Sequence, residues 1–204
     1  MTPVVSILLI ATVGAYLLQM TAPALASLLV FFPPVALERP WTIVTYMFLH
    51  GGFTHILFNM IALFFFGPRV EARIGARPFA ILYFLSGITG AVFSFFLAHD
   101  SPIIGASAGV FGVMLAFAHY WPRELVYIWG VIPVPARVLV ILTTIITLWS
   151  GFGSVGSGIA HFAHLGGYAG AFLYLLWLER GRTRFKRKVA AAPPEATKRA
   201  ADWK

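Results

Sequence analysis

The chain has 204 residues, of which 59% are hydrophobic and 11% are charged, and its mean hydropathy is +0.84. A soluble domain of this length needs more polar surface to cover its core, so the composition excludes an ordinary soluble protein and indicates a membrane protein. The formal net charge of +8 suits nucleic acid in principle, but the basic residues lie beside apolar runs and act as topology signals, so we predict no nucleic-acid partner. The absence of cysteine excludes disulfide bonds and thiolate metal sites.

Apolar runs of about the length needed to cross a bilayer core of about 30 Å recur along the chain. We predict six spans, at Val4–Met20, Ile56–Phe66, Phe79–Ala98, Ser107–Tyr120, Val131–Trp149 and Ile159–Leu178. No internal repeat is visible. The predicted fold is therefore an all-α, polytopic bundle of six transmembrane helices over residues 1–180, followed by a basic, disordered cytoplasmic tail over residues 181–204.

The distribution of Lys and Arg predicts the orientation of these spans. Nine of the 15 lie between Arg180 and Lys204, and most of the others lie in the second–third and fourth–fifth connections. Loops rich in Lys and Arg stay in the cytoplasm, so both termini are predicted to be cytoplasmic. The connections that contain Glu38-Arg39, His99-Asp100 and Gly151–Gly158 are predicted to face outward. We expect the basic tail to contact anionic lipid.

The first span is preceded by no basic residue. Ala24-Leu25-Ala26-Ser27 resembles a signal-peptidase site, but a signal peptide normally begins with a charged segment, and Met1-Thr2-Pro3 has no charged side chain. We therefore predict that this span is retained as a membrane helix.

Counting residues from the cytoplasmic charges gives the depth of each polar side chain. At 1.5 Å per helical residue, Ser107 and His164 each lie roughly 24 Å from the cytoplasmic side, and His55 roughly 21 Å. Asn59 lies one turn deeper than His55. Four polar groups from three helices are thus predicted to share the outer half of the bilayer, where such groups by default mark a functional site.

Ser107 lies between Gly105 and Gly109, near the predicted start of a helix. Taken alone, this pattern is typical of a packing face of small residues. A helix N-terminus also presents free amides that suit a nucleophile forming an oxyanion. His164 is a candidate base for Ser107, although an isolated histidine is more often hydrogen-bonded to backbone. Gly166, Gly167 and Gly170 predict close approach to another helix, and the expected partner is the glycine face of the fourth span, formed by Gly105 and Gly109.

His55 and Asn59 are four residues apart and share one helical face. Their side-chain N–H groups are candidate oxyanion donors, and helix–helix hydrogen bonding is the plainer alternative. His50 is expected to order the loop around Gly51-Gly52. His50, His55, His161 and His164 could in principle cluster around a metal, but no HExxH motif is present, so we predict no metal site.

Five segments of the chain together resemble the rhomboid family of intramembrane serine proteases. They are a first outer loop, an HxxxN motif, a cytoplasmic turn, a GxSxG motif and a histidine motif, located at Pro40–Gly52, His55–Asn59, Glu71–Gly75, Gly105–Gly109 and Ala163–Gly167. They occur in the order that the family has, and the likeness covers almost the whole chain.

This resemblance implies a serine endopeptidase in a bacterial or archaeal cell membrane, cleaving transmembrane proteins near the outer face without a cofactor. Ser107 would be the nucleophile and His164 the base. His55, Asn59 and the Ser107 backbone N–H would form the oxyanion hole. The supporting positions are Gly105, Gly109, Phe111 and Gly167.

Three positions depart from the family pattern. Thr42 follows Trp41 where many relatives have Arg, which puts the polar contacts of the outer loop in doubt. Phe111 stands where Tyr is common, and its ring is expected to pack against His164. Ala171 replaces a glycine, a small-for-small change.

Two other classes of function fit the sequence less well. An inactive relative that acts as a membrane chaperone or adaptor should have lost Ser107 or His164, and this chain has both. A small transporter should have polar residues leading on to the cytoplasmic side, but the segment Met60–Phe66 below Asn59 is apolar.

Overall fold

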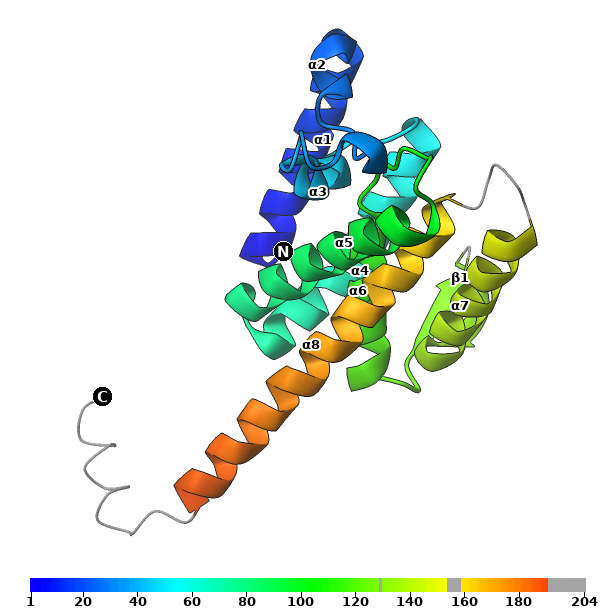
Figure 1. The fold of residues 1–204 in the computed structure, drawn as a ribbon. Helices are drawn as coiled ribbons and strands as arrows, with labels where there is room; N and C mark the ends of the chain where they lie inside the picture. The colour runs from blue at the N-terminus through cyan, green and yellow to red at the C-terminus, as the bar shows by residue number, and fades with distance from the viewer. Residues whose placement is uncertain (129, 154–158, 191–204) are drawn as a thin grey trace. The chain divides into compact units, whose positions relative to one another are not determined.

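The computed structural model describes residues 1–128, 130–153 and 159–190, which are mostly helical (Figure 1). The long helices are α1 (Pro3–Thr21), α4 (Phe53–Ile74), α5 (Ala76–Leu97), α6 (Ser107–Tyr120), α7 (Ala136–Gly153) and α8 (Ile159–Ala190). The segment between α1 and α4 holds the short helices α2 (Pro23–Ser27), η1 (Pro33–Val35), α3 (Thr42–Thr45) and η2 (Tyr46–Phe48). The strands β1 (Leu125–Ile128) and β2 (Ile132–Pro135) separate α6 from α7. Residues 1–172 form one compact unit and residues 173–204 a second.

A long helix lies over each of the six predicted spans, but only some of these helices have the length of a full span. Among the described residues, α1, α4 and α5 are long and apolar enough to cross a membrane. The apolar helices Ser107–Tyr120 and Ala136–Ile146 are shorter. The prediction of membrane helices is therefore confirmed, and the total of six spans stays a prediction.

The all-α prediction is wrong for the connection between α6 and α7, where β1 and β2 form an antiparallel hairpin. Gly130 turns the chain with φ of 71°, in the left-handed region that favours glycine. Pro133 and Pro135 have no backbone N–H and disfavour a helix, while the neighbouring β-branched residues favour a strand. The predicted fifth span, which began at Val131, therefore begins as a helix only at Ala136.

Helix α4 continues past its predicted end at Phe66, through Pro68, and stops at Gly75, where φ is 98°. The buried carboxylate of Glu71 explains part of this extension. It accepts the backbone N–H groups of Val4 at 3.1 Å and Val5 at 2.9 Å. These amides belong to the first turn of α1, which has no partner for them within its own helix. The end of α4 therefore caps the start of α1.

The same end of α4 also holds the end of α6. The Arg69 guanidinium forms an ion pair with Glu124 at 2.8 Å and lies over the Trp121 ring at 4.6 Å. Arg73 lies over the Tyr120 ring at 5.2 Å. These two basic residues, predicted to lie in a loop, thus belong to a helix and use their charge in contacts with aromatic rings.

Glycines of α8 allow its backbone to touch two neighbouring helices (Figure 1). Any Cβ at Gly167 would collide with the backbone of Ala108 in α6, which confirms the predicted contact with the fourth span. The other two predicted glycines meet α5 instead: Gly166 faces the Thr89 backbone and Gly170 the Thr89 side chain. Thr89 Oγ1 also donates to the Gly166 carbonyl at 2.7 Å.

The predicted tail begins as a helix, because α8 continues to Ala190. The rest of that tail, residues 191–204, lies outside the described residues. The predicted outer connection Gly151–Gly158 is described only to Gly153, which is the last residue of α7. The rest of this connection, residues 154–158, also falls outside the described residues.

Candidate active site

Ser107 and His164 lie side by side, on α6 and α8. The distance between Ser107 Oγ and His164 Nε2 is 2.8 Å, which is a hydrogen bond. Ser107 is the first residue of α6, so it stands at a helix N-terminus as the sequence predicted. The contact between Ala108 and Gly167 described above lies one residue from the serine and three from the histidine, and it brings the two helices together.

Gly90 of α5 lies against both helices, next to Ser107 on α6 and next to His164 on α8. A Cβ at Gly90 would lie 2.7 Å from the Ala108 Cβ and 2.8 Å from the Ala163 carbonyl oxygen, the neighbours of Ser107 and His164. Sequence reasoning did not single out Gly90. The signal was present, because Ser86, Gly90 and Ser94 recur every four residues along α5, a spacing typical of close helix contacts.

Phe111 holds the plane of the His164 imidazole. The two rings are stacked, with centroids 4.2 Å apart and an interplanar angle of 16°. Phe111 lies one turn after Ser107 on α6, so the same helix supplies the hydroxyl and the ring on which the imidazole rests. The Phe111 ring also lies near the Tyr168 ring, with centroids 5.1 Å apart, and the Tyr168 hydroxyl is hydrogen-bonded to Thr143 of α7 at 2.8 Å.

Gly105 brings His55 next to the serine. Its φ is 125°, a backbone conformation that side chains rarely allow. A Cβ at this position would lie 2.7 Å from Cε1 of His55, 2.8 Å from Nε2 of His55 and 3.8 Å from Ser107 Oγ. The Gly105 N–H donates to the Tyr46 carbonyl at 2.9 Å. Both the conformation and the crowding at this position therefore require glycine.

Gly109 has a different role from the one predicted. We expected it to bring α6 against α8, together with Gly105. A Cβ at Gly109 would instead lie 2.7 Å from the Tyr83 ring, so this glycine accommodates α5. The serine and histidine helices meet through Ala108, which is on another face of α6.

His55 and Asn59 share one face of α4, as their spacing predicted. His55 Nδ1 accepts the Gly51 N–H at 3.3 Å, so a neutral His55 carries its proton on Nε2, which lies on the edge of the ring that faces Gly105. Asn59 is buried and donates from Nδ2 to the His55 carbonyl at 2.8 Å. An amide has two N–H groups, so one donor of Asn59 is not used by this bond.

His50 binds the loop that ends at Ala106, directly before Ser107, which we call the nucleophile loop. It was predicted to order the loop around Gly51-Gly52 instead. The side chain is fully buried, and its Nε2 accepts the Ala106 N–H at 3.3 Å, directly before Ser107. Burial, with a smaller effect of the neighbouring His55 imidazole, lowers the pKa of His50 to about 4. The neutral form that this hydrogen bond requires is therefore the form that the environment favours.

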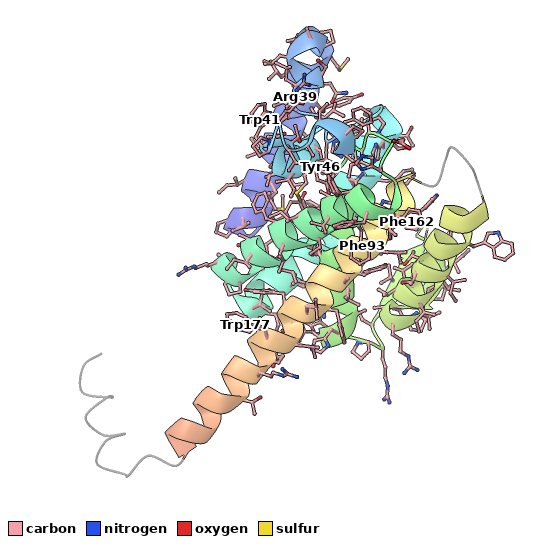
Figure 2. The ribbon with its side chains drawn as sticks, in the orientation of Figure 1. Arg39, Trp41, Tyr46, Phe93, Phe162 and Trp177 are labelled. Carbon is pink, nitrogen blue, oxygen red and sulfur yellow. The ribbon has the colours of Figure 1, made fainter. Side chains whose placement is uncertain are left out.

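Two further residues missed by sequence reasoning support this loop. Gln19 of α1 donates from Nε2 to the His50 carbonyl at 2.7 Å and accepts the His50 N–H at 3.0 Å. Tyr46, the first residue of η2, extends toward α5 and donates its hydroxyl to the Gly87 carbonyl at 2.8 Å (Figure 2). A glutamine in an apolar helix indicates a polar contact, but the sequence does not show that the partner of Gln19 is His50, 31 residues away.

The histidines of the site are spread over three segments. The His161 and His164 rings lie 6.2 Å apart, and the His50 and His55 rings lie 4.9 Å apart. Within the part of the chain that the structure describes, no group of three His, Asp or Glu side chains is arranged to hold a metal ion.

Comparisons with known proteins find one family. Residues 37–180 match the model of the rhomboid domain. RHOMBOID-like protein 4 of Arabidopsis thaliana is 33% identical over 136 residues, which cover 67% of this chain and 33% of that protein. The putative rhomboid protease YdcA of Bacillus subtilis (strain 168) is 32% identical over 136 residues, or 65% of this chain and 64% of that protein.

An inactive member is among the similar proteins as well. Inactive RHOMBOID-like protein 8 of Arabidopsis thaliana is 32% identical over 128 residues, which cover 63% of this chain and 35% of that protein. The chain thus spans between about a third and about two thirds of the length of these three relatives.

Proposed function

Because this chain belongs to the rhomboid family, a family of multi-pass membrane proteins, we propose that it is an intramembrane serine endopeptidase with a Ser107–His164 dyad. The observation that carries the proposal is the 2.8 Å hydrogen bond between Ser107 Oγ and His164 Nε2, at a helix N-terminus. Nucleophile and base within hydrogen-bond reach, with the base held by a third group, is the arrangement that acyl transfer requires. Here the third group is the Phe111 ring.

The first half of the reaction forms an acyl-enzyme. Ser107 Oγ attacks the carbonyl carbon of the substrate peptide bond, and His164 Nε2 accepts the hydroxyl proton. The tetrahedral intermediate collapses when the C–N bond breaks, and the imidazolium of His164 gives its proton to the leaving amine. In the second half, water attacks the ester carbonyl, His164 takes a proton from it, and Ser107 is released with that proton.

Three donors are proposed for the oxyanion of the tetrahedral intermediate. They are the Ser107 backbone N–H, the Nε2–H of His55 and the unused amide N–H of Asn59. The short approach of His55 to Gly105 supports this assignment, because it brings the imidazole edge beside the nucleophile. Such donors stabilise the transition state more than the substrate, since negative charge develops only there.

The substrates of the proposed reaction are transmembrane proteins cut near the outer face. The charge distribution supports this location, because it directs the termini to the cytoplasm and the serine to the outer half of the bilayer. We propose that the site opens outward and that water for hydrolysis enters from that side. The chemistry needs no cofactor, because two side chains and water supply every proton transfer.

Cleavage of a reporter transmembrane protein in liposomes tests the proposal. Wild type, Ser107→Ala and His164→Ala are compared, and each replacement is expected to lower the rate by at least about a thousandfold. Ser101→Ala is the matched control, because Ser101 lies in the same loop and is expected to leave the rate unchanged. Undiminished cleavage by Ser107→Ala would show that the serine is not the nucleophile.

A second candidate function is an adaptor that binds membrane helices without cutting them, favoured by the likeness to an inactive relative. A fluorophosphonate probe separates the two, because it reacts with an activated serine whatever the substrate. We expect wild type to be labelled at Ser107 and His164→Ala to resist labelling. Unlabelled wild type that still retains reporter helices would favour the adaptor.

A further inference from the structure

The β1–β2 hairpin is joined to α7 without a linker. β2 ends at Pro135 and α7 begins at Ala136. Two backbone hydrogen bonds close the base of the hairpin: Ala136 N–H donates to the Glu124 carbonyl at 2.8 Å, and Arg137 N–H to the Pro122 carbonyl at 3.2 Å. Because the first turn of α7 takes part in these bonds, any surface that holds the hairpin also holds the start of α7.

Several side chains of the hairpin are apolar and exposed, whereas Val126, Ile128, Val134 and Pro135 are half-buried. Leu125, Tyr127, Val131 and Ile132 have exposed fractions of 49%, 58%, 76% and 55%. No residue from 125 to 135 is charged. A hairpin that faces water on one side normally alternates apolar and polar residues, and this one does not. Its exterior therefore suits an apolar environment.

The backbone excludes the middle of a membrane as that environment. A hairpin of two strands leaves the backbone groups of its outer edges unpaired, and the hydrocarbon core does not tolerate such unpaired groups. In water, an isolated two-stranded hairpin is only marginally stable. The region of the lipid headgroups suits both parts of the hairpin. Water and phosphate can hydrogen-bond to the backbone edges, and the adjacent acyl chains can contact the apolar side chains.

The charges at the base of the hairpin favour an anionic surface. Arg123 and Arg137 flank the apolar stretch and are both exposed. The neighbouring carboxylate, Glu124, is already paired with Arg69 at 2.8 Å. In the described part of the chain neither Arg123 nor Arg137 has a carboxylate partner. Two free guanidinium groups beside an apolar surface match the phosphates and acyl chains of anionic lipid.

The β2 edge argues against a protein strand as the partner. Ala136 donates to Glu124, and alternate residues of an antiparallel strand point the same way, so Pro133 and Pro135 take the outward positions. Proline has no N–H, and the outer edge of β2 therefore lacks the donors that an added strand needs. A lipid surface requires no such ladder.

We propose that the β1–β2 hairpin is an interfacial anchor that binds an anionic lipid surface and fixes the start of α7 at the level of the headgroups. Arg123 and Arg137 contact lipid phosphates, while Leu125, Tyr127 and Val131 lie among the first carbons of the acyl chains. The predicted topology puts this surface on the cytoplasmic leaflet. The anchor does not depend on the protease chemistry, so the two proposals are tested separately.

The absence of cysteine from the chain allows a direct test. Val131→Cys in the 204-residue chain carries a single nitroxide label, and the protein is reconstituted into phosphatidylcholine vesicles with or without phosphatidylglycerol. Collision rates with oxygen, which enriches in lipid, and with a water-soluble nickel chelate report the depth of the label. We expect an oxygen-to-nickel ratio several-fold higher than at Ala76→Cys, an exposed position in the α4–α5 turn.

The charge requirement is measured in the same vesicles. Phosphatidylglycerol is expected to raise the ratio at position 131, and Arg123→Gln with Arg137→Gln is expected to remove that rise. Circular dichroism checks that each labelled variant keeps its helical content.

Three results would overturn the proposal. The first is a label at position 131 that the nickel chelate reaches as easily as at position 76. The second is a ratio that does not respond to phosphatidylglycerol. The third is a label shielded from oxygen and nickel alike, which would mean that protein, such as a second copy of the chain, covers the hairpin.

Discussion

The side-chain amide of Gln19 binds the backbone of His50 on both sides, donating to its carbonyl at 2.7 Å and accepting its N–H at 3.0 Å. His50 in turn accepts the Ala106 N–H, one residue before Ser107. Helix α1 is thus connected to the nucleophile loop through two side chains. The first span therefore contributes to the site although none of its residues is proposed to touch the substrate.

Gln19→Leu is expected to destabilise the protein. The change removes two hydrogen bonds of about 1 kcal/mol each and leaves two buried backbone groups of His50 without a partner. We expect a loss of about 2–4 kcal/mol in the free energy of unfolding, measured by denaturation in mixed micelles, together with slower reporter cleavage. Leu17→Ala removes an exposed side chain of the same helix and should change neither quantity appreciably. Equal stability of the two variants would contradict the role given to Gln19.

The lowered pKa of His50 predicts acid sensitivity. In the unfolded chain the imidazole titrates near 6.5, and in the folded protein its pKa is about 4. Between these values the unfolded state binds more protons, so stability is fully present above pH 6.5 and decreases as the pH falls toward 4. Unfolding of wild type and His50→Gln at several pH values measures this. In the variant, the free energy of unfolding should depend less on pH between 6.5 and 4 than in wild type. An unchanged dependence would mean that other groups cause the acid sensitivity.

Gly105→Ala is expected to abolish cleavage. The new methyl group meets His55 at 2.7 Å, and the backbone is left-handed at this position. Gly130→Ala is the matched control, because Gly130 also has a positive φ but a Cβ there meets nothing within 4 Å. Both variants should lose about 1–2 kcal/mol of stability from backbone strain. Only Gly105→Ala should lose activity, and equal activity of the two would show that the crowding at His55 does not matter.

Phe111→Leu is expected to lower kcat/KM for the reporter. The stacked ring is worth about 0.5–1.5 kcal/mol, which corresponds to a two- to tenfold effect if it holds the imidazole in its reactive orientation. Phe111→Tyr keeps the ring and should stay close to wild type. Phe96→Leu, at an exposed position of α5, controls for the loss of a ring in general. A Phe111→Leu enzyme as active as wild type would remove the ring from the mechanism.

The shared level of Ser107 and His164 could be predicted because it depends on local quantities. Each of the two lies about 16 residues from a basic residue near the other end of its predicted span, and a helix converts that number into a distance of roughly 24 Å. The structure brings these two side chains into contact. The position of His55 beside Gly105 agrees with the same count.

The features that could not be predicted from the sequence depend on contacts between distant segments. A helix was predicted from Val131 because the hydrophobic periodicity of a continuous apolar run does not distinguish a strand from a helix. Pro133 and Pro135 were the only local sign against a helix there. The predicted partner helix of Gly109 was wrong because a small residue predicts close packing but does not show which neighbouring helix packs there. The pairs Gln19–His50 and Glu71–Val5 join segments 31 and 66 residues apart, a separation that spacing alone does not reveal.

The cap that Glu71 places on α1 has a consequence for the order in which the protein is assembled. Val4 precedes Glu71 by 67 positions, so a ribosome completes α1 long before it makes the carboxylate that binds the amides of its first turn. Until α4 has been inserted, those amides remain solvated by water or headgroups. Helix α1 is made before α4 and thus becomes fixed only after α4 has entered the membrane.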